Sequence, residues 1–314
     1  MYVVTGGAGF IGANLVRGLN ARGITEILVV DDLSVGTKHR NLDGLQFADY
    51  LDFRDFRTRL PGFAHIDAVL HQGACSDTMQ ADGRYMMDNN YQFSKELLAW
   101  ALALRTPFLY ASSASVYGHG VHGFREEPAC EHPLNIYAFS KTLFDRWVRQ
   151  ALPRAQSQVV GLRYFNVYGP GEAHKARMAS VAFHFHQQAK ADQTLKLFQG
   201  SEGFRRDFIS VADVVAVNMH FLDHPEQSGI FNCGTGQARS FQDLAGIVAR
   251  ERPGTVVAAV PFPPELRGKY QSFTQADASL LRAAGYQKPF TTLEDGVSTY
   301  LRTLATQEQE QTHG

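Results

Sequence analysis

The sequence has few cysteines, little net charge and no long apolar run, and each shortage excludes a class of protein. Cys75, Cys130 and Cys233 are odd in number and far apart, which argues against a disulfide framework and against a zinc cluster. A formal net charge of −1 argues against nucleic acid or an anionic membrane as the main partner. No apolar stretch approaches the roughly 20 residues of a membrane helix. We therefore expect a soluble protein of the reducing cytoplasm, with no metal site.

The composition indicates a globular chain with a sizeable core. Its 314 residues are 44% hydrophobic and 19% charged, which is typical of soluble proteins with one large or two modest domains. The chain starts directly in an apolar segment at Tyr2, so no signal peptide is expected. Residues 305–314 are rich in Gln, Glu and Thr, and we expect them to be a disordered tail.

A glycine-rich loop near the N-terminus predicts a dinucleotide site. Residues 2–5 form a short apolar strand, and Gly6, Gly9 and Gly12 follow before a helix. This spacing allows a tight turn, a close approach of a pyrophosphate to the backbone, and packing of the helix on the strand. A second apolar strand at 27–32 lies at the expected distance. The fold class is therefore α/β, with a Rossmann-type, doubly wound parallel sheet.

The end of that second strand leaves the choice of cofactor open. Asp31 and Asp32 are acids of the kind that bind the ribose hydroxyls and favour NAD. Lys38 and Arg40 follow closely, and their charges could neutralise the 2′-phosphate of NADP. On physical grounds both NAD and NADP remain possible.

Tyr137 and Lys141 are four residues apart in a predicted helix and therefore share one face. A nearby ammonium group favours ionisation of a phenol, which makes the tyrosine a better acid and base. Ser113 ends an apolar strand, whose tip should open into the ligand crevice. The order Ser, Tyr, Lys behind a glycine loop resembles the short-chain dehydrogenase/reductase superfamily, extended type.

Two further segments of the first half belong near the cofactor. A predicted strand at 67–71 leads into the small-residue turn 72–76, where the pyrophosphate and the nicotinamide ribose should pass. Cys75 in this turn is expected to pack rather than to act as a nucleophile. Asn89, in a helix predicted over 85–104, either fixes the catalytic geometry or is a capping or surface amide.

The second half has a different organisation. We expect residues 1–168 to form the Rossmann domain, with later segments returning to it, and residues 169–304 to form mainly a smaller α/β substrate domain. Arg205, Arg206 and Arg267 are candidates for binding the diphosphate of a substrate. The alternative is that these arginines are solvated surface residues.

Residues 1–304 resemble the ADP-L-glycero-D-manno-heptose 6-epimerase family. The resemblance rests on the strings at 71–76, 86–92, 164–170, 174–175, 178–184 and 206–208. It implies inversion of C6 of the heptose in ADP-D-glycero-D-manno-heptose, by transient oxidation to a ketone and re-reduction with tightly held NADP. It also implies a role in lipopolysaccharide core precursor synthesis and a cytoplasmic homo-oligomer, typically a pentamer. Another NDP-sugar epimerase or a reductase is the alternative.

The resemblance also assigns roles to residues. Ser113 would bind the reacting oxygen, Tyr137 would exchange its proton, and Lys141 would hold the nicotinamide ribose. Because the ketone must turn over, a second proton donor is needed, and Lys175 is the candidate; it could instead pair only with the substrate diphosphate. Cofactor-binding residues would be Gly6, Gly9, Phe10, Ile11, Gly12, Asp31, Asp32, Lys38, Gln72, Gly73, Ala74, Cys75, Ser76, Asn89, Tyr137, Lys141, Val167 and Lys175. Substrate-binding residues would be Ser113, Asn166, Arg177, His184, Phe198, Gln199, Gly200, Ser201, Arg206 and Tyr270.

The chain differs from related dehydratases at one place and departs from the heptose epimerase pattern at three. Related sugar-nucleotide dehydratases carry an Asp-Glu pair after the catalytic serine, where this chain has Ala114 and Ser115, so dehydration is disfavoured. Heptose epimerases usually have Glu where Gln72 stands and a small residue where Arg177 stands. They also tend to carry a lysine near Phe53, which would help to bind the adenosine phosphate.

Overall fold

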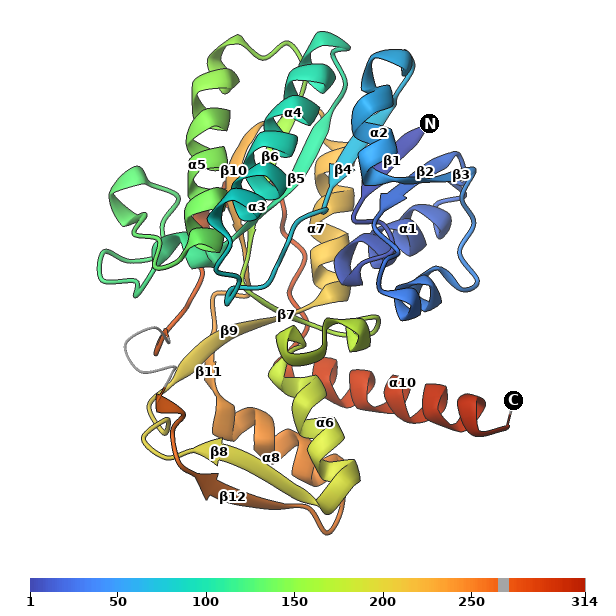
Figure 1. Ribbon diagram of the computed structural model, residues 1–314. Coiled ribbons are helices and arrows are strands. Elements are labelled where there is room, and N and C mark those ends of the chain that lie inside the picture. Colours follow the sequence, from blue (N-terminus) through green and yellow to red (C-terminus); the bar gives the residue numbers. More distant parts are fainter. Residues whose placement is uncertain (265–270, 314) are drawn as a thin grey trace.

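The computed structural model describes residues 1–264 and 271–313, and its larger part is built on a seven-stranded sheet (Figure 1). All neighbouring strands in this sheet pair in parallel, in the order β10-β6-β5-β4-β1-β2-β3. The strands are β1 (Tyr2–Thr5), β2 (Ile27–Asp31), β3 (Asp49–Asp52), β4 (Ala68–His71), β5 (Phe108–Ser113), β6 (Val159–Tyr164) and β10 (Gly229–Cys233). Most are continuous apolar runs because helices cover both faces. The predicted Rossmann-type fold is confirmed.

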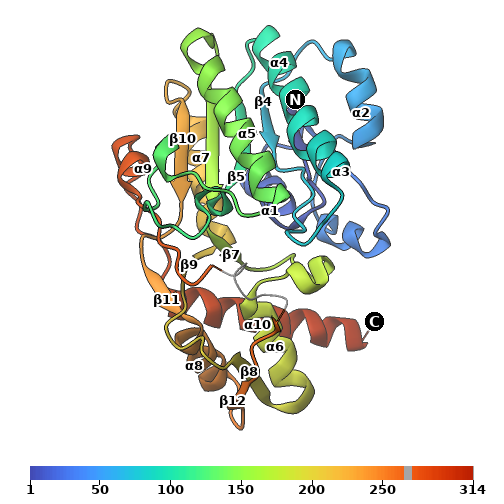
Figure 2. The same cartoon turned by 60° about the vertical axis from the view of Figure 1, so that its left-hand side comes forward.

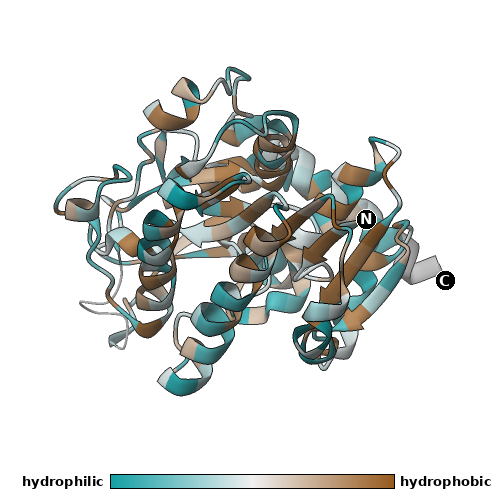
Figure 3. Cartoon of the chain, turned by 90° about the horizontal axis from the view of Figure 1, so that it is seen from above, coloured by the Kyte–Doolittle hydropathy of each residue, from teal (hydrophilic) through white to brown (hydrophobic). Residues whose placement is uncertain are grey.

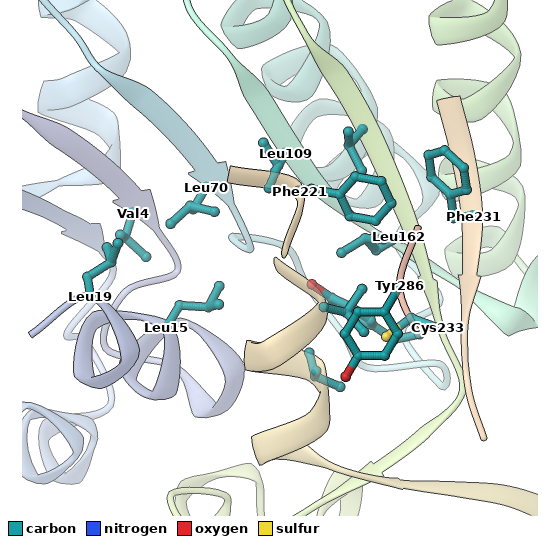
Figure 4. Close-up of a cluster of buried hydrophobic side chains, with 14 of the residues drawn as sticks. Val4, Leu15, Leu19, Leu70, Leu109, Leu162, Phe221, Phe231, Cys233 and Tyr286 are labelled. Atoms are coloured by element: carbon teal, nitrogen blue, oxygen red, sulfur yellow. The ribbon is translucent and has the colours of Figure 1, made fainter. Parts of the chain in front are cut away.

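Helices lie on the two faces of this sheet. One face carries α1 (Phe10–Asn20) and α7 (Val211–Asp223), and the other carries α2 (Phe53–Arg59), α4 (Phe93–Ala103) and α5 (Ile136–Ala151). Figure 4 shows the first of these cores, where Leu15 and Leu19 of α1 belong to one buried cluster with Val4 and Leu70 of the sheet. Figure 3 shows brown, hydrophobic strands between helices of mixed colour, as expected for a buried sheet with amphipathic helices.

The smaller part lies below the carboxyl ends of the strands (Figures 1 and 2). It contains a three-stranded sheet, a two-stranded sheet and three helices with a core of their own. The strands are β7 (Asn166–Tyr168), β9 (Arg205–Ser210) and β11 (Ala238–Ser240), and separately β8 (Thr194–Phe198) and β12 (Val256–Val260). The helices are α6 (Val181–Asp192), α8 (Phe241–Glu251) and α10 (Leu293–His313). Later elements of the chain return to the larger sheet, namely α7, β10 and the short helix α9 (Ser279–Ala283), whose Leu281 belongs to the core under α1.

The C-terminal segment differs from the expected disordered tail at 305–314. Helix α10 continues to His313. Leu301 and Leu304 bury one of its faces, and Glu308 pairs with His186 and Lys190 of α6 at 3.0 and 3.1 Å. Gln and Glu are good helix formers, so a polar composition alone did not exclude a helix that docks on a neighbour.

The predicted helix over 85–104 is divided. Its first part is α3 (Gly83–Met87), a π-helical turn follows at Asp88–Gln92, and α4 completes it. Such turns occur often at functional sites. None of the helices in the described ranges is long and apolar enough to span a membrane. The same ranges contain no cluster of metal-ligating side chains.

Candidate active site

A cavity of about 710 Å³ opens at the carboxyl ends of the sheet strands, beside the point where the strand order reverses between β1 and β4. Ligands of doubly wound folds bind at this place. The predicted residues that line it are Gly6, Gly9, Phe10, Ile11, Gly12, Asp31, Lys38, Gln72, Gly73, Ala74, Cys75, Ser76, Ser113, Tyr137, Lys141, Val167, Lys175 and Arg177. An adjoining cavity of about 270 Å³ shares part of this lining and adds Asp32 and Asn89.

The glycine loop has the shape that a pyrophosphate site requires. Gly6 has a positive φ of +64°, and a Cβ added there would lie 2.7 Å from the backbone nitrogen of Gly73. A Cβ on Gly12 would lie 2.0 Å from the Gly6 carbonyl oxygen, so no larger residue fits. Helix α1 begins after Gly9 without a side-chain cap, which leaves backbone N–H groups and the positive end of the helix dipole for an anion.

The end of the cleft at the tip of β2 carries three carboxylates and two cations. Asp31 is buried, accepts a hydrogen bond from Ala8 N at 2.7 Å and pairs with Lys38. Asp32 pairs with Arg54 at 3.2 Å, and Arg54 also pairs with Asp52. The guanidinium of Arg54 lies 4.5 Å from the centre of the neighbouring Phe53 ring.

Arg54 was missed in the sequence, where only a lysine near Phe53 was considered. The signal was a basic residue one position further on. Phe53 lines the adjoining cavity, so its neighbour Arg54 stands at the edge of that cavity.

Strand β5 and helix α5 bring the Ser-Tyr-Lys set together. Burial raises the pKa of Tyr137, and a hydrogen bond with Ser113 opposes this rise. Lys141 is buried and donates a hydrogen bond to the Ala111 carbonyl oxygen at 2.8 Å. Burial lowers the pKa of Lys141 to about 8. Ser113 thus acts on the phenol from the end of β5, while Lys141 is bound by the same strand.

The turn at 72–76 is held by Asn90 rather than by Asn89. Cys75 N donates to Asn90 Oδ1 at 2.8 Å, and Asn90 Nδ2 donates to Cys75 O at 2.9 Å. Asn89 lines the adjoining cavity and donates to Asn90 Oδ1 at 3.1 Å. The side-chain nitrogen of Gln72 is buried without a hydrogen-bond partner among the described residues, although its oxygen accepts from Tyr164 at 3.1 Å. An unpaired buried donor in this cavity fits a polar ligand.

Lys175 enters the cavity from the side of α1. Its Nζ atom lies 5.2 Å from the ring centre of Phe10, the first residue of α1. Burial lowers the pKa of Lys175, while the charge of Glu172 opposes this shift. Glu172 is itself buried and accepts hydrogen bonds from the Ser180 hydroxyl at 2.7 Å and from the Tyr300 hydroxyl at 3.0 Å. The loop that carries Lys175 is therefore fixed to α6 and α10.

Arg177 lies at the rim of the same cavity. Its side chain is exposed and pairs with Asp77 at 2.6 Å, so the ion pair bridges the loop after β7 and the segment after β4. Ala176, between Lys175 and Arg177, has a φ of +46°, which is strained for a residue other than glycine. This backbone turn separates a cavity-lining lysine from an exposed arginine.

The remaining predicted substrate residues are not brought to the large cavity. Phe198 and Ser201 line a separate cavity of about 270 Å³ beside β8 and β12. Arg206 is buried on β9, with its guanidinium 5.6 Å from the Phe241 ring centre. Asn166, Gln199 and Gly200 form hydrogen bonds with residues outside the large cavity. His184 does not line the cavity, but its Nε2 atom lies 3.4 Å from the carbonyl oxygen of Arg177 at the rim. Tyr270 and Arg267 lie outside the described residues.

Comparison with known proteins agrees with this geometry. The model of the NAD dependent epimerase/dehydratase family matches residues 2–234. The chain therefore belongs to the NAD dependent epimerase/dehydratase family, in which a nicotinamide-dependent site of this kind is expected.

The similarity extends to particular members. The chain is 53% identical, over 97% of its length and 98% of that protein, to the ADP-L-glycero-D-manno-heptose-6-epimerase of Brachyspira hyodysenteriae. The crystal structure of the Helicobacter pylori ADP-L-glycero-D-manno-heptose-6-epimerase is 30% identical, with a TM-score of 0.86 over 97% of this chain and 96% of that one. The UDP-glucose 4-epimerase of Thermus thermophilus, solved with NAD, is 28% identical with a TM-score of 0.79, over 97% and 98% of the two chains. The predicted resemblance to heptose 6-epimerases is confirmed.

Proposed function

We propose that this chain is an ADP-heptose 6-epimerase. It would convert ADP-D-glycero-D-manno-heptose to ADP-L-glycero-D-manno-heptose by oxidising C6 to a ketone and reducing it from the opposite face. The product would serve as a precursor of the lipopolysaccharide core. The observation that carries the proposal is that Tyr137 and Lys175 line one cavity, beside a glycine loop shaped for a dinucleotide.

The two proton-exchanging groups come from different sides of this cavity. Tyr137 belongs to α5, which covers one face of the sheet. Lys175 lies against Phe10 of α1, which covers the other face. The two C6 epimers present their oxygens in different directions, so a donor on each side avoids moving a fixed tyrosine by ångströms. The arrangement supports a reaction in which oxidation and reduction use different proton carriers.

The residues around C6 would have different roles in the reaction. Ser113 would bind the reacting oxygen and keep the Tyr137 phenol directed toward it, since the Ser113 side chain already acts on Tyr137 and both residues line the cavity. Tyr137 would take the hydroxyl proton on one face, and Lys175 would serve the other face. The lowered pKa of Lys175 makes its neutral form more accessible, as a general base requires. A bound nicotinamide dinucleotide would supply reversible hydride transfer without net consumption.

We infer that NADP is the cofactor, with NAD as the competing possibility. Lys38 and Arg54 are the cations at the adenosine end, and both are paired with aspartates. A 2′-phosphate would compete with Asp31 and Asp32 for them. Lys141 would hold the nicotinamide ribose, and the N–H groups that follow Gly9 would bind the pyrophosphate. We further infer, from the family resemblance, a cytoplasmic homo-oligomer, with a pentamer expected by light scattering.

The reaction can be tested with a substrate that carries deuterium at C6. Purified protein is incubated with the labelled ADP-D-glycero-D-manno-heptose, and the product is analysed by proton NMR and mass spectrometry. We expect the L-glycero epimer with the deuterium retained, because the same hydride returns to C6. Loss of the label to solvent would contradict transient oxidation at C6.

The same experiment separates related reactions. A dehydratase would give a product lighter by one water, which we do not expect because Ala114 and Ser115 supply no acid after Ser113. A 4-epimerase would instead interconvert UDP-glucose and UDP-galactose. Turnover of UDP-glucose with none of the ADP-heptose would replace the proposal by that activity.

A further inference from the structure

We propose that Asp145 is a positioning residue of the active site, and that it holds Tyr137 and Lys141 in register against strand β5. This inference rests on the proposed epimerase reaction. Asp145 continues the spacing of the other two, since the three residues stand at four-residue intervals on α5. They therefore share one face of the helix. We call Tyr137, Lys141 and Asp145 the α5 row.

Each member of the α5 row lies beside one of three consecutive residues of β5. The Ser113 side chain acts on Tyr137 and lowers its pKa, and the Ala111 carbonyl oxygen accepts a hydrogen bond from Lys141 at 2.8 Å. Ser112 Oγ donates to Asp145 Oδ2 at 3.0 Å. The end of the strand and the face of the helix are thus joined at three places. Of these, only the contact at Asp145 lies fully inside the protein.

Asp145 is also the most firmly anchored member of the α5 row. Its side chain is completely buried and accepts hydrogen bonds from Tyr110 OH at 2.8 Å and from Arg163 Nε at 2.9 Å. Arg163 is likewise fully buried and also pairs with Glu131. The carboxylate therefore connects α5 to both β5 and β6. A buried charge with this many partners fixes one arrangement of the elements around it.

The charge of Asp145 also acts on Lys141. Burial lowers the pKa of Lys141, and the negative charge of Asp145 opposes that shift. Among the described residues, Cys75 in the turn after β4 also acts on the pKa of Lys141, and Lys141 acts on that of His71 on β4. Tyr137 stands one turn away on the same helix, and Arg163 of β6 pairs with Asp145. Burial keeps His71 neutral, with a pKa lowered to about 3.

The size of this effect follows from helix geometry. Side chains one turn apart lie roughly 6 Å from each other. At an effective dielectric constant of about 20, unit charges at that distance shift a pKa by roughly two units, and by less where water screens them. Asp145 thus helps Lys141 to remain an ammonium ion at neutral pH, as binding of a ribose hydroxyl requires.

The test is Asp145→Asn, which preserves size and removes the charge. We expect kcat at pH 8 to fall about tenfold or more, with the KM for the ADP-heptose changed less than threefold. The alkaline limb of the pH profile should move down by roughly one pH unit. Independently of turnover, the pH dependence of Lys141 acetylation, followed by mass spectrometry on cofactor-free protein, should shift in the same direction.

Glu131→Gln is the matched control. It removes a fully buried carboxylate that pairs with Arg163 and also with Arg146 and Arg149 of α5, but that forms no hydrogen bond or ion pair with the α5 row among the described residues. We expect it to lower the melting temperature without moving the alkaline limb or the acetylation profile. Equal shifts in both variants would mean that the buried ion network acts as a whole, and would overturn the role of Asp145.

A milder change keeps the inference testable if Asp145→Asn does not fold. Tyr110→Phe removes one hydrogen bond to Asp145 and leaves its charge in place. It should lower kcat several-fold with an unchanged alkaline limb, and an unchanged kcat would overturn the positioning role. A wild-type protein that does not turn over ADP-heptose would refute the proposed function instead. The acetylation profile would then still decide whether Asp145 controls Lys141.

Discussion

Replacing Lys175 by methionine tests the two-sided mechanism most directly. The ammonium nitrogen of Lys175 lies over the Phe10 ring, and a methionine side chain is long enough to pack its sulfur near the same ring. Glu172 retains its hydrogen bonds from Ser180 and Tyr300, so the loop should stay in place. We therefore expect the variant to fold and to bind cofactor like the wild type.

The expected loss is in turnover. Removal of a general acid–base group typically costs about 10²–10⁴-fold, which corresponds to about 3–5 kcal/mol in the activation free energy. Since burial lowers the pKa of Lys175, its neutral form is more accessible than that of an exposed lysine. Steady-state assays at saturating ADP-heptose should thus show kcat reduced by at least about a hundredfold.

Arg177→Met provides the contrast. Arg177 is exposed at the rim and pairs with Asp77, so it can contact the substrate diphosphate but is placed away from the proton transfer. Its loss should raise KM and leave kcat within a few-fold of the wild type. If Lys175→Met shows the same pattern, with a normal maximal rate and a raised half-saturation concentration, Lys175 only binds the diphosphate and the second-base role is refuted.

Three further predictions concern the catalytic tyrosine, the cofactor and stability. Tyr137→Phe should keep the fold and the bound nucleotide but lower kcat by about 10²–10⁴-fold, and near-normal epimerisation by this variant would exclude Tyr137 as the acid–base group. Mass spectrometry of the nucleotide released on denaturation should find NADP; NAD alone would mean that Asp31 and Asp32 dominate the ribose site. Burial, reinforced by the charge of Lys141, lowers the pKa of His71 from 6.5 to about 3, so between these values the unfolded chain binds a proton that the folded chain does not. The contribution of neutral His71 to the free energy of unfolding should therefore be fully present above about pH 6.5. Below that pH, the free energy of unfolding should fall by up to about 1.4 kcal/mol per pH unit. In urea titrations at pH 7 and 5, His71→Gln should lose less stability on acidification, and an unchanged acid slope would contradict this.

The sequence by itself determined the fold class and the chemical core of the site. A Cβ added at Gly6, Gly9 or Gly12 would lie within 3.0 Å of a backbone atom, so the loop geometry requires glycine at these positions. The spacing of the glycines therefore predicts that geometry. The continuous apolar strands reflect a sheet covered on both faces, which is a local property of each segment. Tyr137 and Lys141 share a helix, and their relation therefore depends only on helical periodicity.

The tertiary structure decided whatever depends on segments far apart in the chain. Asp145 gains its significance from Ser112, Tyr110 and Arg163, which approach it only when β5 and β6 lie side by side. The helix at the C-terminus is stabilised by burial and by the contact of Glu308 with α6, which composition does not reveal.

The placement of Tyr137 and Lys175 on different sides of the cavity also depends on the tertiary structure. Lys175 follows Tyr137 by 38 positions in the sequence, and only packing against Phe10 places it on the α1 side of the cleft. Local spacing fixes which side chains share a strand or a helix, whereas the opposition of two catalytic groups depends on how separate elements pack.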